Sequence, residues 1–332
     1  MLVLAAKRLC SMKIIHISNI NLNPYSSVGS ESVERFTSVA RHVERFNSDA
    51  DHVVITGGLS QYGESAGYRQ FNTLLERCSL KGTLKPKLLM GNGDSREHYS
   101  SVFPKIELDF NGFNQWVEKT ASGWLVFLDT ALVGKNSGHF CDRRIEWLTH
   151  VLDAAAGCDA AVFLFMHHNP VPVRIGTAQS VSVRQIDKLH VLLRNYRNTI
   201  KHIFYGQGYS PLSRPIYGIS LSVPRSPSCP WWTQAQNTVV HADADQRQLA
   251  YNVCTIERSN VQIQEIGFRH PVQEAKTVLD DFRCPEDIGQ SSSSAEYKLP
   301  LKYTKRDLRR VKRFAIKTDY NVVQLERKNL CS

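Results

Sequence analysis

Apolar and polar positions follow two alternating periods along most of the chain. Short, nearly continuous apolar runs at 13–18, 52–56 and 161–166 predict strands that are buried on both faces. After the first of these runs, Val33 and Phe36 begin an apolar stripe with the three-to-four-residue spacing of an amphipathic helix. Further strands are predicted within the stretches PKLLMGNGD, WLVFLDT and HIFYGQGYS, and further helices at 68–78, from about 142, and at 182–195. Because strands and helices alternate, the pattern predicts a layered α/β fold.

The character of the chain changes after residue 206. The segment AYNVCTIERSNVQIQEIGF predicts a β-hairpin that turns at Ser259–Asn260. Four serines at 291–294 are typical of a linker. We therefore expect one α/β domain at 12–270, followed at 271–332 by a linker and a basic tail that contains a short helix.

The net charge of +10 belongs mainly to this tail. Residues 291–332 hold eleven Lys and Arg against four Asp and Glu, which gives +7 and leaves +3 for the rest of the chain. The short helix predicted in the tail carries six basic residues: Lys305, Arg306, Arg309, Arg310, Lys312 and Arg313. Such a charge run either forms a solvated face that docks on its own domain, or binds nucleic acid or an anionic membrane surface.

Composition limits the class and the compartment. Hydrophobic residues make up 42% of the chain, and no apolar run approaches the roughly 18 to 20 residues of a membrane-spanning helix. The eight cysteines are scattered and form no C-x-x-C pair, so we expect reduced thiols and a cytoplasmic location.

Polar residues and glycines follow the predicted strands at the point where each strand ends. They are Asn19 and Asn21, Gly57 and Gly58, Gly91 to Asp94, His167 and His168, and Gly206 to Tyr209. In a layered α/β fold the carboxyl ends of the strands converge on one crevice, so these residues are predicted to share one site.

This ordered series resembles the calcineurin-like metallophosphoesterases, in particular the class III cyclic-nucleotide phosphodiesterases. The family pattern is D-x-H, G-D, G-N-H-D, H-H and G-H-x-H, and the chain offers IIHISNINL, VVITGGLSQYGE, LLMGNGDSR, FLFMHHNPV and GQGYSP in the same order over about residues 12–268. The resemblance implies a four-layer αββα sandwich. It also implies hydrolysis of phosphoric esters by two divalent metal ions bound at the strand ends.

The chain departs from this pattern at most of the positions that would hold the metals. These positions carry Asn19, Asn21, Gly58, Asn92, His167, Gln207 and Tyr209. Only Asn92 and His167 match the family, both carboxylates are lost, and the position of the catalytic histidine is Gly93. Neutral amides bind divalent transition metals weakly, and a glycine cannot bridge two of them. We therefore expect no intact catalytic group and no dinuclear metal centre.

Several roles remain open for the residues of the predicted crevice. Asn92 and Asp94 either cap the helix after their turn or act as ligands, and His167 and His168 are either hydrogen-bonded core histidines or pocket walls. Gln207 and Tyr209 either fill the volume that metals occupy in the family or take part in a neutral pocket for a phosphate or nucleotide. That pocket would comprise Asn19, Asn21, Arg96, Gln207 and Tyr209.

The sequence predicts a catalytically degenerate metallophosphoesterase-like protein, a pseudoenzyme, that acts as a binding or regulatory module for a phosphate-containing ligand. Two alternatives stay open. One is an active metal-dependent phosphodiesterase with an atypical or single-metal site that uses Mn, Fe or Zn at Asn92 and His167. The other is a nucleic-acid-binding protein that uses the basic tail.

Overall fold

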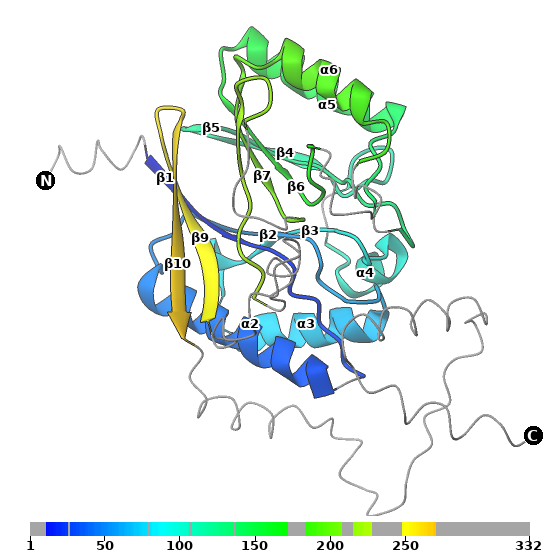
Figure 1. The fold of residues 1–332 in the computed structure, drawn as a ribbon, viewed down its shortest axis with the longest axis vertical. Helices are drawn as coiled ribbons and strands as arrows, with labels where there is room; N and C mark the ends of the chain where they lie inside the picture. The colour runs from blue at the N-terminus through cyan, green and yellow to red at the C-terminus, as the bar shows by residue number, and fades with distance from the viewer. Residues whose placement is uncertain are drawn as a thin grey trace, which may run out of the picture. The chain divides into compact units, whose positions relative to one another are not determined.

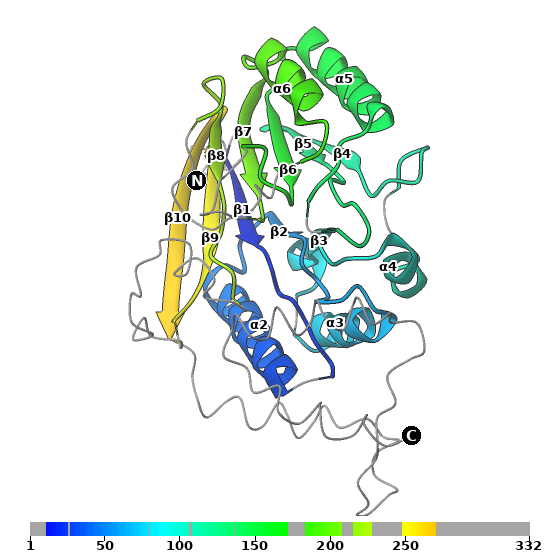
Figure 2. The same cartoon turned by 45° about the vertical axis from the view of Figure 1, so that its right-hand side comes forward.

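Two five-stranded β-sheets form the frame of the computed structural model (Figures 1 and 2). The structure describes residues 11–25, 27–78, 80–105, 108–135, 137–171, 183–207, 215–227 and 248–269. The first sheet has the strand order β10-β9-β1-β2-β3, and the second has the order β4-β5-β6-β7-β8.

The first sheet is built around β1 (Ser11–Ile17), which pairs in parallel with β2 (His52–Thr56) and antiparallel with β9 (Gln248–Glu257). The short β3 (Lys87–Leu89) extends one side in parallel, and β10 (Asn260–Arg269) extends the other side antiparallel. This sheet therefore joins the beginning of the described chain to its end.

The second sheet contains four parallel strands and one antiparallel edge strand. Its strands are β4 (Trp116–Thr120), β5 (Gly123–Phe127), β6 (Val162–Met166), β7 (Ile200–Tyr205) and β8 (Ser220–Ser222). Strands β5 and β6 are buried along their whole length, which explains their unbroken apolar sequences.

Helices cover the outer face of each sheet. On the first sheet lie α2 (Ser27–Phe46) and α3 (Ser65–Arg77), with α4 (Arg96–Val102) beside them, and η1 (Gly82–Leu84) leads into β3 (Figure 2). On the second sheet lie α5 (Asp142–Gly157) and α6 (Ile186–Asn195), whose leucines pack against β5, β6 and β7. The fold is thus a four-layer αββα sandwich, as the sequence predicts.

Aromatic rings from neighbouring strands stack in the layer between the sheets. The ring centroids of Trp116 and Phe127 lie 4.3 Å apart, those of Phe127 and Phe165 lie 5.1 Å apart, and those of Phe165 and Phe204 lie 4.5 Å apart. Ile14 and Val54 of the first sheet belong to the same buried cluster. These contacts fix the two sheets face to face, and with them the strand ends of both sheets.

The structure shifts the predicted hairpin turn by one residue. The hairpin turns at Arg258–Ser259, one residue earlier than predicted, and both residues have positive φ angles of 45° and 73°. Among the described cysteines, Cys78 and Cys254 are buried, whereas Cys158 is exposed.

In the described part of the chain no helix has the length and apolar character needed to cross a membrane. The tail at 271–332 lies outside the described residues, so its helix stays a prediction.

Candidate functional site

The loops that leave β1 and β2 form the floor of the candidate site. They continue side by side beyond the strands through backbone hydrogen bonds: Asn19 N–H donates to Gly57 O (3.0 Å), and Asn21 N–H donates to Gly58 O (2.6 Å). Asn19 and Asn21 adopt left-handed conformations with φ angles of 56° and 49°. Asparagine enters this region more readily than most residues, so the backbone itself favours asparagine at both positions.

The side chains of Asn19 and Asn21 close around Gly58. The Asn19 amide donates to Gly206 O over 2.8 Å, which links the end of β1 to the end of β7 across the two sheets. A Cβ atom built on Gly58 would lie 2.8 Å from Asn21 Oδ1 and 2.9 Å from both Cα and Oδ1 of Asn19. Such distances are shorter than real Cβ contacts, so a side chain at the position of the family's bridging carboxylate would require the Asn19 backbone and both asparagine side chains to shift.

Asp94 joins the loop after β2, its own turn after β3 and helix α3, and it does not cap a helix. Its buried carboxylate accepts hydrogen bonds from four backbone N–H groups and from the Tyr68 hydroxyl (3.0 Å); the backbone donors are Gly58, Leu59, Ser60 and Gly91. The N-cap of α4 is Ser95, whose hydroxyl accepts from His98 N. The pKa of Asp94 is raised to about 6, because the effect of burial exceeds the opposite effect of the hydrogen bonds. The predicted capping role of Asp94 is therefore wrong.

His167 and Asn92 meet at the centre of the site. The His167 ring is fully buried, and its Nδ1 lies 2.6 Å from Thr56 O, to which it donates. Its Nε2 is hydrogen-bonded to the side-chain amide of Asn92. The pKa of His167 is lowered to about 4, because the effect of burial exceeds the opposite effect of the hydrogen bond to Thr56. Nε2 faces Oδ1 of Asn92 and Nδ1 faces Thr56 O, so both ring nitrogens lie against an oxygen.

The structure brings together most of the remaining predicted residues. The Gln207 backbone donates to His167 O over 2.6 Å, and the Gln207 side chain is buried. His168 points to another partner, because its Nδ1 lies 2.8 Å from the Thr130 hydroxyl. Gly93 has φ +90°, which favours glycine. Tyr209 lies outside the described residues.

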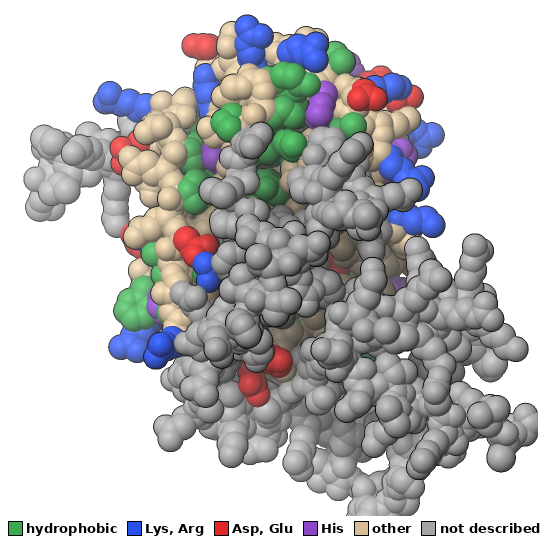
Figure 3. Space-filling view, in the orientation of Figure 1, with side chains coloured by type: hydrophobic (Ala, Val, Ile, Leu, Met, Phe, Trp, Pro, Cys, Tyr) green, Lys and Arg blue, Asp and Glu red, His purple; other side chains and the backbone are tan. Residues whose placement is uncertain are grey.

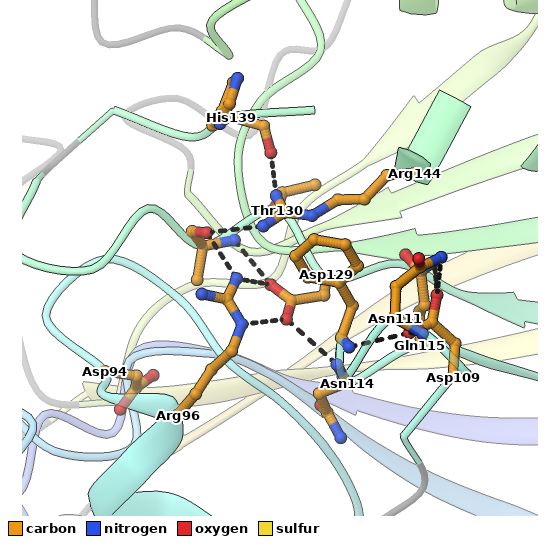
Figure 4. A network of polar contacts seen from close by, with 12 residues as sticks. Asp94, Arg96, Asp109, Asn111, Asn114, Gln115, Asp129, Thr130, His139 and Arg144 are labelled. Carbon is orange, nitrogen blue, oxygen red and sulfur yellow. Dashed lines mark hydrogen bonds and ion pairs between the residues drawn. The ribbon is translucent and has the colours of Figure 1, made fainter. Parts of the chain in front are cut away.

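Arg96 is held by a buried carboxylate beyond the floor of the crevice (Figure 4). Its guanidinium donates to both oxygens of Asp129 at 2.7 Å and to Ala131 O at 2.7 Å. Asp129 also accepts from the backbone of Ala131 and Asn114, and the ring of Phe113 lies beneath the guanidinium. The expectation that Arg96 belongs to an anion pocket with Asn19 and Asn21 is not supported by these contacts.

Sequence reasoning missed Asp129 as an organiser of this region. The residue sits in the stretch FLDT directly after β5, at the same end of the strands as the crevice, and its side chain is fully buried. A lone aspartate behind an apolar strand is the signal that would have found it, because a buried carboxylate needs a paired cation or several donors.

The residues of the crevice do not fit a pair of divalent metal ions. Within the described ranges no group of three His, Cys, Asp or Glu side chains is positioned to bind a metal. The floor supplies the amides of Asn19, Asn21 and Asn92 and the single imidazole of His167. The carboxylate of Asp94 already accepts five hydrogen bonds, so among the described residues of the crevice no carboxylate is left to offset two dications.

The chain thus combines a four-layer αββα sandwich with a cluster of polar residues at the ends of its strands. No protein-family model matches the chain. Over 199 residues the chain is 29% identical to a probable cyclic nucleotide phosphodiesterase of Rhodopseudomonas palustris, covering 59% of this chain and 69% of the relative.

Two further relatives carry similar descriptions. The chain is 26% identical to a 3′,5′-cyclic adenosine monophosphate phosphodiesterase of Vibrio vulnificus, over 49% of this chain and 57% of the relative. It is 25% identical to a cAMP/cGMP dual specificity phosphodiesterase of Mycobacterium tuberculosis, over 63% of this chain and 65% of the relative. The solved structure of a purple acid phosphatase from yellow lupin covers 86% of this chain and aligns over 57% of its own length, with 11% identity and a TM-score of 0.49.

These relatives confirm the predicted resemblance to the calcineurin-like metallophosphoesterases and, within that family, to the class III cyclic-nucleotide phosphodiesterases. They are described as phosphodiesterases, which supports the predicted alternative of an active enzyme better than the pseudoenzyme hypothesis. The family's use of divalent metals also gives no support to the expectation that this chain needs no cofactor.

Proposed function

We propose that the crevice binds a phosphodiester of the cyclic-nucleotide class without a dinuclear metal centre. The relatives supply the ligand class, since three of them are described as cyclic-nucleotide phosphodiesterases. The observation that carries the metal-free part of the proposal is Gly58, which supplies no carboxylate at the bridging position and has a positive φ that favours glycine.

Neutral groups in this crevice suit binding better than hydrolysis. Amide N–H groups donate to phosphate oxygens and do not require a metal as intermediary. A hydrolase also needs a group that activates water, and the titratable candidates here are engaged. His167 is neutral with both ring nitrogens in hydrogen bonds, and Asp94 accepts five hydrogen bonds. Gly93 offers no side chain at the family's catalytic position.

The second candidate function is a metal-dependent phosphodiesterase with one metal ion. The descriptions of the relatives favour it over the first. In the structure, the contact between Asn92 and His167 favours it, because both side chains direct a donor atom to the same point of the crevice. A single divalent ion at this point would supply Lewis-acid assistance to the phosphate.

Calorimetric titration of cyclic AMP and cyclic GMP into the full chain separates the two candidates. The first predicts equal binding in EDTA and in Mn²⁺, and a rise in unfolding free energy of about 2.7 kcal/mol at a ligand concentration of 100 Kd. It also predicts no loss of cyclic nucleotide by chromatography in either buffer.

The second candidate predicts turnover in Mn²⁺ that disappears in EDTA and in His167→Ala. The matched control is His139→Ala, because His139 is bonded to Gln185 near the second sheet and not to Asn92. Turnover in the wild type and the control, together with about one bound metal per chain, would replace the first proposal by the second. Absence of binding in both buffers would reject both.

The basic tail supports a separate proposal of nucleic-acid or anionic-surface binding. It lies outside the described residues, so only its composition supports this. Deleting residues 291–332 should abolish any RNA or DNA binding that weakens steeply with salt. Salt-sensitive binding that survives the deletion would contradict this role for the tail.

A further inference from the structure

Strand β10 forms a long open edge of the first sheet. It is ten residues long, and its pairing with β9 continues from Asn260 to Arg269 without a register shift. Among the described residues no strand pairs with its other edge, and the strand lies at the outer side of the sheet in both ribbon views (Figures 1 and 2). Exposed edges are usually protected by lysine, proline, a bulge or short length, and β10 has none of these devices.

The end of β10 is self-complementary in an antiparallel pairing. Its last five residues are Glu-Ile-Gly-Phe-Arg, at 265–269. An antiparallel pairing centred on Gly267 places Glu265 opposite Arg269 of a second copy, and Ile266 opposite Phe268 of that copy. Two-fold symmetry repeats each pair, so the pairing contains two opposite-charge pairs and two aromatic–aliphatic pairs. Both kinds of cross-strand pair stabilise antiparallel sheets.

The orientation of the side chains agrees with this pairing. Phe268 stacks on His42 of α2 with ring centroids 4.0 Å apart, so Phe268 and Ile266 face the helix layer. Glu265 faces the opposite side, where it forms an ion pair with Arg225 (2.8 Å). In the proposed pairing, residues that lie opposite each other have either two odd or two even numbers. They therefore lie on the same face of the joined sheet, as an antiparallel pairing requires.

An exposed aromatic side chain adjoins the same edge. Phe46, at the end of α2, is 58% exposed and lies against His42 with ring centroids 4.5 Å apart. The guanidinium of Arg45 lies over the Phe46 ring at 5.2 Å. Figure 3 shows hydrophobic, basic and histidine side chains together where α2 meets β10. A second chain at the edge of β10 would cover part of this apolar surface.

We propose that two copies of this chain associate through β10, in antiparallel register about Gly267, and join their first sheets into one ten-stranded sheet. The crevice lies at the ends of the strands, and the joined edge lies at the side of the sheet. Each copy therefore retains its own crevice, and association does not depend on the ligand.

Light scattering behind size exclusion tests the association, and charge reversal tests the register. The wild type should approach twice the monomer mass of 37.6 kDa as concentration rises through the micromolar range. Arg269→Glu places two like-charge pairs in the interface and should weaken association about tenfold or more. Adding Glu265→Arg to it restores two opposite-charge pairs, so the double variant should dimerise again.

A symmetric crosslink gives an independent test of the centre. In a Cys158→Ser background, Gly267→Cys should form an intermolecular disulfide under mild oxidation, because residue 267 faces itself across the two-fold axis. The matched control is Gln262→Cys, which is exposed on the same strand but distant from its own copy in this register. A wild type that stays monomeric at all concentrations would overturn the proposal. A dimer that is insensitive to Arg269→Glu, or that is crosslinked equally through residue 262, would also overturn it.

Discussion

Replacing Gly58 by alanine tests whether the crevice is closed at the position of the family's bridging carboxylate. Gly58 has φ +65°, and a left-handed conformation costs a residue with a Cβ about 1–2 kcal/mol. The new methyl group would overlap Asn21 Oδ1 and the Asn19 backbone, and overpacking of this kind costs about 1–3 kcal/mol. Alanine also restricts the unfolded chain more than glycine does, which offsets about 0.4–1 kcal/mol of this loss of stability. We expect Gly58→Ala to lose roughly 1.5–4 kcal/mol of unfolding free energy.

Gly82→Ala is the control that separates backbone strain from crowding. Gly82 has a similar φ of +61°, but nothing lies within 4 Å of a Cβ built there, so only the conformational part of the cost applies. Urea unfolding of both variants measures the difference, and a domain of this size loses about 2–4 °C in melting temperature per kcal/mol. If Gly58→Ala loses no more stability than Gly82→Ala, the crevice has room at residue 58. A bridging carboxylate would then fit at this position.

Two further predictions concern buried charge and protonation. Burial lowers the pKa of His16 to about 3 and those of His167 and His202 to about 4, so the unfolded chain binds up to about three more protons between pH 6.5 and 4. Their stabilisation is present above pH 6.5 and is lost as the pH falls. The melting temperature should drop steeply below pH 6.5, and less steeply in His202→Gln; parallel pH profiles would contradict this. Asp129→Asn breaks a buried charge pair and should lower the free energy of unfolding, measured in urea, by about 3–5 kcal/mol. The control Asp109→Asn should lower it less, because Asp109 is only partly buried. Equal losses in the two variants would contradict the role of the pair.

The sequence predicts the layers well because the parallel strands are buried on both faces. Such strands are nearly continuous apolar runs, and β2 begins and ends at the predicted residues. Strand β4 is absent from the prediction because its mixed residues are only half-buried and show no clear period. The hairpin turn lies one residue earlier than predicted. Neither Arg258 nor Ser259 is a residue type that typically adopts the left-handed conformation, so the sequence does not indicate the turn there.

The position of the candidate site was predictable, but its hydrogen-bond partners were not. Polar residues at strand ends mark the crevice because the fold brings those ends together. The pairing of Arg96 with Asp129, by contrast, joins the first residue of α4 to a residue of the loop after β5, 33 positions along the chain. Local spacing contains no information on such a pair. The same limit applies to Asp94, whose backbone donors become visible only when the loop after β2 is placed beside the turn that contains Asp94.

The place of β1 in the first sheet has a consequence for synthesis of the chain. This strand lies between β2 and β9, so one of its edges meets its native partner only after residues 248–257 have left the ribosome. Until then an apolar strand near the start of the chain has an unsatisfied edge, which is a hazard for aggregation. The high sequence separation of the contact also makes closure of this sheet a late and slow event. Efficient production of the protein should therefore depend on chaperones that hold nascent chains until the final hairpin emerges.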